Sequence, residues 1–109
     1  MAVLATQAPS LSGLAASYSA ATATTGDTFK AERGAIVHVK NGGGSPTTVT
    51  FDALATPGGM TLTDPGGSVP AAGDRFFTLS DPRYFKDSNG MCKVTCSVVT
   101  SVTVAVIKA

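Results

Sequence analysis

Residues able to carry out acid–base or nucleophilic chemistry are scarce in this chain of 109 residues. It holds a single histidine, His38, and a single glutamate, Glu32. Serine and aspartate are plentiful, but no Gly-x-Ser-x-Gly motif occurs, so a Ser-His-Asp triad has no support. His38 alternates with apolar neighbours beside Lys40 and is expected on the outward face of a strand, as a surface side chain. We therefore expect a protein that is not an enzyme and has no catalytic residues.

The two cysteines, Cys92 and Cys96, lie in an alternating segment typical of a strand. Four residues of strand span about 13 Å, whereas a disulfide needs Cα atoms within about 7 Å. The pair is therefore expected to be reduced and buried on one face of one strand. A metal site would need further ligands, and only His38 and scattered aspartates remain. The Gly-rich segment after Asn41 lacks the Lys-Ser/Thr end of a P-loop. We expect no metal and no cofactor.

Charge excludes two classes of partner. Eight basic residues against seven acidic ones leave a net charge of +1, which offers no electrostatic footprint for nucleic acid or for an anionic membrane. No apolar stretch is long enough to form a transmembrane helix. The N-terminus has no basic region, and Gln7, Pro9 and Ser10 interrupt its apolar residues, so a secretory signal is not expected. These features predict synthesis in a cytoplasm and no binding to nucleic acid or membranes.

The elements that must position these residues are strands. The chain is rich in Thr, Val and Gly, which favour strands and tight turns. We predict an all-β single domain, a β-sandwich or small β-barrel of jelly-roll-like type, with roughly six to eight strands. Two hairpins are predicted, over 35–53 around Gly42–Ser45 and over 91–108 around Val98–Ser101. Shorter strands are expected at 60–63, 67–69 and 75–79, and one helical turn at 80–85. The predicted core residues are Val37, Val39, Val49, Phe51, Phe77, Leu79, Val94, Val102, Val104 and Val106.

The two ends of the chain carry surplus apolar residues. Residues 1–16 are small and weakly periodic, and we interpret them as an extended N-terminal arm that precedes the β-rich domain of residues 17–109. In the last strand, one face carries Val104 and Val106 and the opposite face also carries apolar side chains. Exposed apolar surface of this kind usually meets a partner. The residues predicted to contact a partner or a sister subunit are Val3, Leu4, Leu11, Leu14, Ala105 and Ile107.

Three segments, taken in order, resemble a known family. They are Ile36-Val-His-Val-Lys-Asn-Gly-Gly-Gly-Ser-Pro-Thr-Thr-Val-Thr-Phe51, then Val69-Pro-Ala-Ala-Gly-Asp-Arg-Phe76 followed by the Asp81-Pro-Arg-Tyr84 turn, and Val99-Thr-Ser-Val-Thr-Val-Ala-Val-Ile-Lys108. The chain is similar here to the small β-rich minor capsid proteins, or head decoration (cement) proteins, of tailed bacteriophages of actinobacterial hosts. The resemblance covers about residues 35–109. It departs at Cys92 and Cys96, where Val, Tyr or Ser would be expected.

The resemblance implies a structural virion protein that binds the outer surface of an assembled phage capsid and stabilises it by bridging major capsid protein subunits of the HK97-type fold. It brings no catalytic residues. Many symmetric copies would let weak contacts add up, and closed symmetry favours a homotrimer, with a dimer as the alternative. The expected location is the outer capsid surface, after synthesis in the host bacterial cytoplasm. The alternatives are another phage structural component, such as a head–tail junction or tail protein, and a small β-domain that binds carbohydrate or nucleic acid.

Overall fold

The chain is built from strands throughout the part that the structure describes. The computed structural model describes residues 2–23, 25–53, 65–78, 85–87 and 89–108. The strands in these ranges are β1 (Ala2–Leu4), β2 (Thr6–Gln7), β3 (Ser19–Ala20), β4 (Asp27–Lys30), β5 (Ile36–Asn41), β6 (Thr47–Phe51), β7 (Gly66–Val69), β8 (Gly73–Thr78), β9 (Met91–Cys96) and β10 (Val102–Ile107). The predicted all-β class is confirmed, and no helix lies in these ranges.

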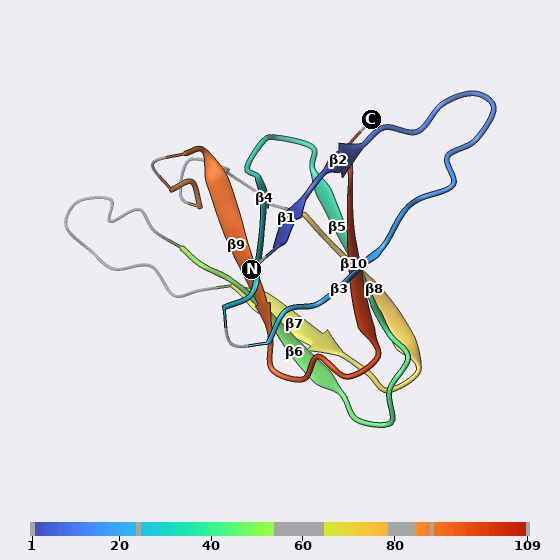
Figure 1. Cartoon of the computed structure of the whole chain (residues 1–109), viewed down its shortest axis with the longest axis vertical. Coiled ribbons are helices and arrows are strands. Elements are labelled where there is room, and N and C mark those ends of the chain that lie inside the picture. The colour runs from blue at the N-terminus through green and yellow to red at the C-terminus, as the bar shows by residue number, and fades with distance from the viewer. Residues whose placement is uncertain (1, 24, 54–64, 79–84, 88, 109) are drawn as a thin grey trace.

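Two mixed sheets face each other across one core (Figure 1). Sheet A has the order β1-β4-β9-β6-β7, and sheet B has the order β2-β10-β5-β8, with β3 also paired to β10. Alternation along each strand sends one set of side chains between the sheets, as in β5, where Val37 and Val39 are buried and Ile36 and Lys40 are exposed. The sandwich form predicted from the sequence is confirmed.

The antiparallel pairs are nested in the sequence. β3 pairs with β10, β4 with β9, β5 with β8, and β6 with β7. This long two-stranded ribbon is then wrapped so that β5 also pairs with β10, and β6 with β9. The resulting four-stranded orders, 3-10-5-8 and 4-9-6-7, are those of an eight-stranded jelly roll.

Both predicted hairpins are wrong. β5 lies in sheet B and β6 in sheet A, while β9 lies in sheet A and β10 in sheet B, so each turn crosses between sheets. Buried polar side chains hold these corners. The Asn41 amide donates to the Ser45 carbonyl at 2.8 Å and to the Val69 carbonyl at 3.3 Å, and accepts from the Gly43 N–H. Thr47 Oγ1 donates to the Val98 carbonyl and accepts from the Val98 N–H, which joins the two corners.

The core closely follows the prediction. Buried side chains include Val37, Val39, Val49, Phe51, Val94, Val102, Val104 and Val106, as predicted, together with Leu4, Phe29, Val69 and Cys92. Phe77 is half-buried and packs against this core. Phe51 meets Phe29 and Phe77 edge to face, with ring centroids 6.2 and 5.7 Å apart. Leu79 lies outside the described residues.

The prediction of an extended N-terminal arm is wrong for residues 2–7, because these residues pair with strands of the sandwich. β1 pairs in parallel with β4, and β2 pairs in parallel with β10, so the segment crosses from the edge of sheet A to the edge of sheet B at Ala5 (Figure 1). Leu4 is only 5% exposed because it fills the core between the two edges. Residues 8–16, named here the N-terminal loop, project from the sandwich instead.

The remaining sequence predictions fall partly outside the described ranges. The strand expected at 67–69 is β7, and the strand expected at 75–79 is β8, which ends at Thr78. The strand expected at 60–63 and most of the helical turn expected at 80–85 lie outside the described residues. Within the described ranges, nothing forms a helix long and apolar enough to cross a membrane.

Candidate functional site

The structure divides the six predicted interface residues into two groups. Val3, on β1, is 73% exposed, Leu11 is fully exposed at the N-terminal loop, Leu14 is exposed, and Ile107 is partly exposed. The prediction that Leu4 and Ala105 contact a partner is wrong, because these residues are only 5% and 2% exposed. Ala105 does lie on the outer face of sheet B, as predicted, but the chain's own N-terminal segment covers it. A small cavity beside it is lined by Ala5, Gln7, Ser17 and Ser19.

The other half of the outer face of sheet B is open and partly apolar. Ile36 and Ile107 are register partners on β5 and β10, and Phe76 lies on the neighbouring strand β8. Phe76 is 64% exposed and Ile36 is 38% exposed. Diagonal neighbours in a sheet lie about 7 to 8 Å apart, within reach of large side chains. Ile36, Phe76 and Ile107 therefore form one patch, named here the sheet B patch, which the sequence analysis recognised only at Ile107.

His38 is buried, not a surface side chain, and this corrects the sequence analysis. It is 7% exposed although it points to the outer face of sheet B. Tyr18 covers it from the N-terminal segment, with its hydroxyl 2.7 Å from Nδ1. The Phe76 ring stacks on the imidazole from the other side, at 4.0 Å between centroids and 9° between planes. Asp74 Oδ2 lies 2.6 Å from Nε2. Sequence spacing alone could not bring Tyr18 to this histidine.

The partners of His38 fix its proton positions in the neutral state. A carboxylate only accepts hydrogen bonds, so Nε2–H donates to Asp74 and Nδ1 accepts from the Tyr18 hydroxyl. The bond from His38 lowers the pKa of the Asp74 carboxyl. Desolvation opposes this shift, and the positive charges of Arg75 and Lys40 add to it. Both ring nitrogens are occupied, so neither is free to take a proton from a substrate. The hydroxyl–imidazole–carboxylate chain positions Tyr18 and Phe76.

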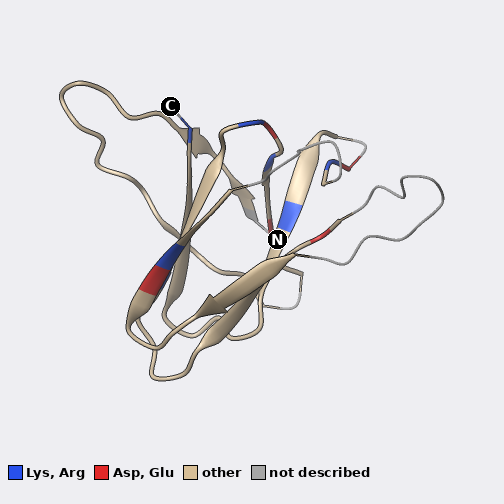
Figure 2. Cartoon of the chain, turned by 180° about the vertical axis from the view of Figure 1, so that it is seen from behind, with Lys and Arg blue, Asp and Glu red and all other residues tan. Residues whose placement is uncertain are grey.

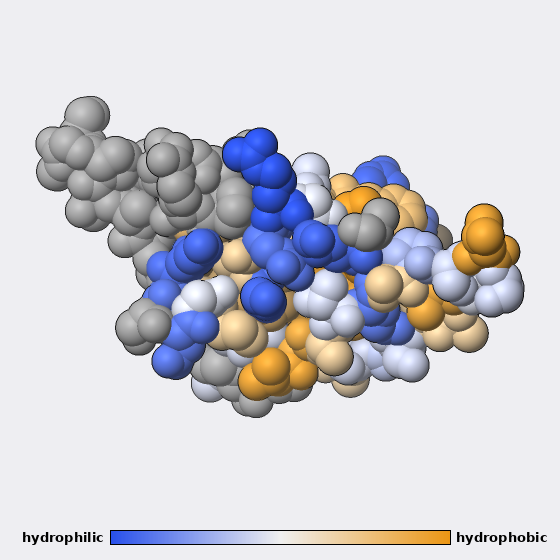
Figure 3. All heavy atoms as spheres, turned by 90° about the horizontal axis from the view of Figure 1, so that it is seen from above, coloured by the Kyte–Doolittle hydropathy of each residue, from blue (hydrophilic) through white to orange (hydrophobic). Residues whose placement is uncertain are grey.

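The N-terminal loop is closed at its base by a side chain. The Gln7 amide donates from Nε2 to the Ser17 carbonyl at 2.8 Å, and its Oε1 accepts from the Ser17 N–H at 2.8 Å. At the loop's tip, the Gly13 N–H donates to the Ser10 carbonyl, and Gly13 takes a φ of 95°, which favours glycine. This turn presents Leu11 to solvent. Seen from above, apolar atoms stand out at the end of the molecule where the loop projects (Figure 3).

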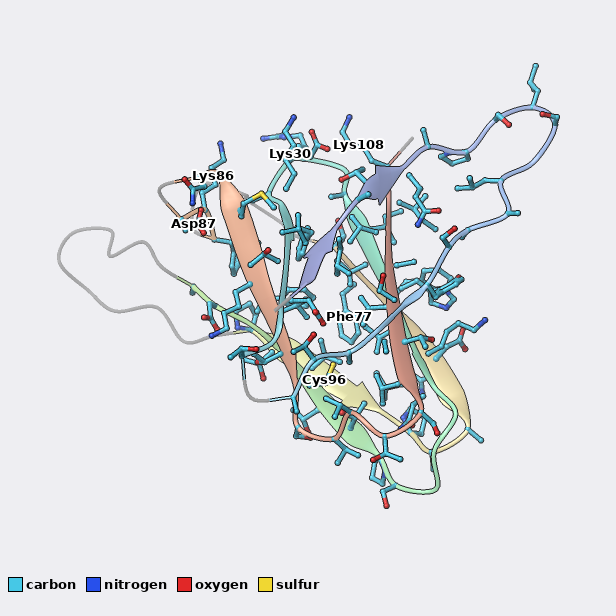
Figure 4. The ribbon with its side chains drawn as sticks, in the orientation of Figure 1. Lys30, Phe77, Lys86, Asp87, Cys96 and Lys108 are labelled. Atoms are coloured by element: carbon cyan, nitrogen blue, oxygen red, sulfur yellow. The ribbon has the colours of Figure 1, made fainter. Side chains whose placement is uncertain are left out.

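Charged residues occupy few positions along the described strands (Figure 2). Lys30, Lys86 and Lys108 point away from the sandwich at one end of the molecule, as Figure 4 shows. Lys30 lies 3.8 Å from the Glu32 carboxylate. On the outer face of sheet B, the ammonium of Lys40 lies 4.6 Å above the Tyr18 ring, a cation–π contact. On the same face, Asp74 lies 2.6 Å from His38, so this pair borders the sheet B patch at Phe76.

The cysteines behave as small core residues. Cys92 is buried, Cys96 is partly buried, and both are free thiols on β9, as predicted. Burial raises the pKa of Cys92 to about 12 and that of Cys96 to about 11, and nearby aspartates add to both shifts. Neutral thiols are poor nucleophiles and poor metal ligands. Among the described residues, no three His, Cys, Asp or Glu side chains gather in a metal-binding group.

Comparison with known proteins gave no match to a family model, a curated protein or a solved structure.

Proposed function

We propose that this protein is a structural virion protein that binds the outer surface of an assembled phage capsid and stabilises the shell by bridging major capsid protein subunits. It acts as a symmetric homo-oligomer, with a trimer as the preferred form. Its contact surface is the sheet B patch together with the leucines of the N-terminal loop.

The sheet B patch is the observation that carries this proposal. A domain of this size has already buried a full core of valines and phenylalanines, yet Phe76 remains 64% exposed on an outer sheet face. Its ring is also held in place by its stack on His38. A rigid, exposed aromatic side chain is the usual anchor of a protein interface, because little conformational entropy is lost when it binds.

The fold is compatible with this role but does not decide it. Jelly rolls occur in viral capsid proteins and also in lectins and cupins, and a fold alone does not imply a function. The shell as partner comes from the resemblance of residues 35–109 to head decoration proteins. The near-neutral net charge of +1 and the apolar sheet B patch favour a protein partner over nucleic acid.

The test is to measure the protein in purified particles of the phage whose genome encodes it. Quantitative mass spectrometry should find it in a fixed ratio to the major capsid protein. Phe76→Ser should lower its occupancy at least about tenfold, because burying a phenylalanine contributes about 1.5 to 3 kcal/mol. Ser68→Asp, on the exposed face of β7 in the other sheet, should leave occupancy unchanged. A handful of copies per particle would indicate a head–tail junction protein, and absence from particles would refute the proposal.

A further inference from the structure

We propose that residues 2–7, named here the N-terminal clasp, exchange between copies of this chain, so that the clasp of one molecule occupies the edges of β4 and β10 in its neighbour. The partner of these edges is thus a second copy. This goes beyond shell binding, because it concerns contacts between copies and needs no capsid.

The jelly roll is complete without the clasp. Its eight strands, β3 to β10, account for all four nested antiparallel pairs and for both wrapping pairs. β1 and β2 are additions at the sheet edges, and each pairs in parallel with one strand only. A segment added to a sheet edge is held by backbone bonds that any copy of the same edge can make.

The clasp carries its own anchor and makes few contacts. β1 pairs three residues with β4, and β2 pairs two residues with β10. Between them, Leu4 enters the core beside its register partner Phe29. One buried leucine and five paired residues form a small, self-contained unit that can leave one sandwich and enter another.

The N-terminal loop is longer than its path requires. Gln7 pairs with Ile107 and Ser19 with Val104, three residues apart on one strand, which is about 10 Å. The nine residues 8–16 can span about 30 Å when extended. That length exceeds the shortest dimension of the molecule, 21 Å, so the loop can carry the clasp to a neighbour.

The far side of the loop is fixed to its own domain. Tyr18 is bonded to His38, and β3 follows at once. The boundary between fixed domain and exchangeable segment therefore falls within residues 8–16. In the exchanged form, Gln7 of one copy closes on Ser17 of its neighbour with the same two hydrogen bonds. Closed and exchanged molecules share these contacts, and exchange adds only the cost of association.

The exposed leucines favour the exchanged form. Leu11 and Leu14 lie in the loop and are exposed in the closed molecule. When the loop bridges two copies, these side chains lie between them and become buried. Burying Leu11 and Leu14 between two copies adds apolar contact that the closed molecule lacks.

Two single variants, mixed in the absence of capsids, test the exchange. Val3 and Thr28 are register partners on β1 and β4, at a spacing that a disulfide can bridge. Val3→Cys and a size-tagged Thr28→Cys protein are mixed at high concentration and oxidised with copper phenanthroline. Neither protein can form this bond within itself. The natural cysteines contribute little background, because their pKa values of about 12 and 11 keep them protonated.

A heterodimer of the two variants is the expected product on a non-reducing gel. The matched control mixes Thr28→Cys with Lys93→Cys, which are register partners on β4 and β9 inside one jelly roll, and should give at least tenfold less heterodimer. Deleting residues 9–14 from the Val3→Cys protein leaves a loop that spans about 10 Å, enough for the closed form alone, and should abolish the product. Equal heterodimer yield in the test and control mixtures would overturn the proposal.

A doubly substituted Val3→Cys, Thr28→Cys protein checks the geometry. In dilute solution it should form a monomeric disulfide, which mass mapping identifies. Failure of exchange with a normal monomeric bond rejects this proposal and leaves the shell-binding proposal standing. Heterodimer formation together with absence from virions would support the exchange and refute the shell-binding proposal.

Discussion

At the scale of single residues, His38 is the link between the N-terminal segment and the sandwich. One ring nitrogen holds the Tyr18 hydroxyl and the other holds Asp74, while Phe76 stacks on the ring. A buried imidazole is tolerated because both of its polar atoms have partners. The cluster therefore sets the position of residue 18 and the orientation of the exposed phenylalanine.

Tyr18→Phe should destabilise the fold by about 1 to 2 kcal/mol, because Nδ1 of His38 then loses its donor while it stays buried. Urea denaturation followed by circular dichroism measures the change. The control is Lys40→Met, which removes the cation above the Tyr18 ring but keeps the hydroxyl bond, and should cost less than about 1 kcal/mol. A Tyr18→Phe variant that is as stable as wild type would show that the hydroxyl bond contributes nothing.

Asp74 gives the protein part of its dependence on acid. Its pKa lies below the ordinary value of 3.8, mainly because of the bond from His38. The contribution to stability is therefore fully present above the pKa of the unfolded chain and is lost as pH falls through the lowered pKa of the folded state. In Asp74→Asn, the urea midpoint should fall less steeply than in wild type as pH drops below about 4. If the urea midpoints of wild type and Asp74→Asn fall equally steeply in acid, Asp74 does not contribute to the acid dependence.

At the scale of elements, close approach of backbones decides where the corners can form. Gly26, just before β4, has a φ of 71°, and a Cβ added there would lie 2.5 Å from the Val94 carbonyl oxygen and 2.6 Å from the Thr95 methyl carbon. The Asp27 carboxylate closes the same turn by accepting bonds from the Thr22 N–H and hydroxyl, at 3.1 and 2.7 Å. This corner has no room for a side chain.

Gly26→Ala should therefore destabilise the fold by about 3 kcal/mol, because backbone strain and overlap add up. Two matched variants separate the causes, each measured by thermal and urea denaturation. Gly34 has a φ of 84° and open space around it, so Gly34→Ala should reduce the free energy of unfolding by about 1 kcal/mol from strain alone. Gly44→Ala has open space and no positive φ, and should lie within about 0.5 kcal/mol of wild type. The reverse order would refute this account of the corner.

At the scale of the whole molecule, the N-terminal clasp seals the sandwich where the two sheets diverge. On β1, Leu4 is buried between the sheets, whereas its neighbour Val3 is 73% exposed. Two neighbouring residues of one strand thus face the core and the solvent respectively. A clasp that contributes to the core must also influence global stability.

Leu4→Ala should reduce the free energy of unfolding by about 2 to 4 kcal/mol, because it leaves a cavity between the sheets. Val3→Ala, one residue away, should change it by less than about 0.5 kcal/mol. Urea denaturation at low protein concentration measures both without association. If the two variants are equally stable, the clasp does not occupy the core in solution.

The sequence by itself determined where most strands lie and which side chains fill the core. Alternation with a period of two is a local property, so Val37, Val39, Val102, Val104 and Val106 could be assigned to one face without knowing any partner strand. The same reasoning placed both cysteines as reduced thiols on one strand. The all-β class follows from these assignments, since a chain of alternating strands must pack sheet against sheet.

Only the tertiary structure decided which strands pair and what covers their outer faces. A five-residue turn can either fold a strand back onto its neighbour or cross the roughly 10 Å between two packed sheets, and local propensity does not distinguish the two. The buried Asn41 amide, bonded to Val69 far along the chain, selects the crossing. Burial of His38, Leu4 and Ala105 likewise depends on the N-terminal segment, whose position is set by edges that form only after the sandwich has closed.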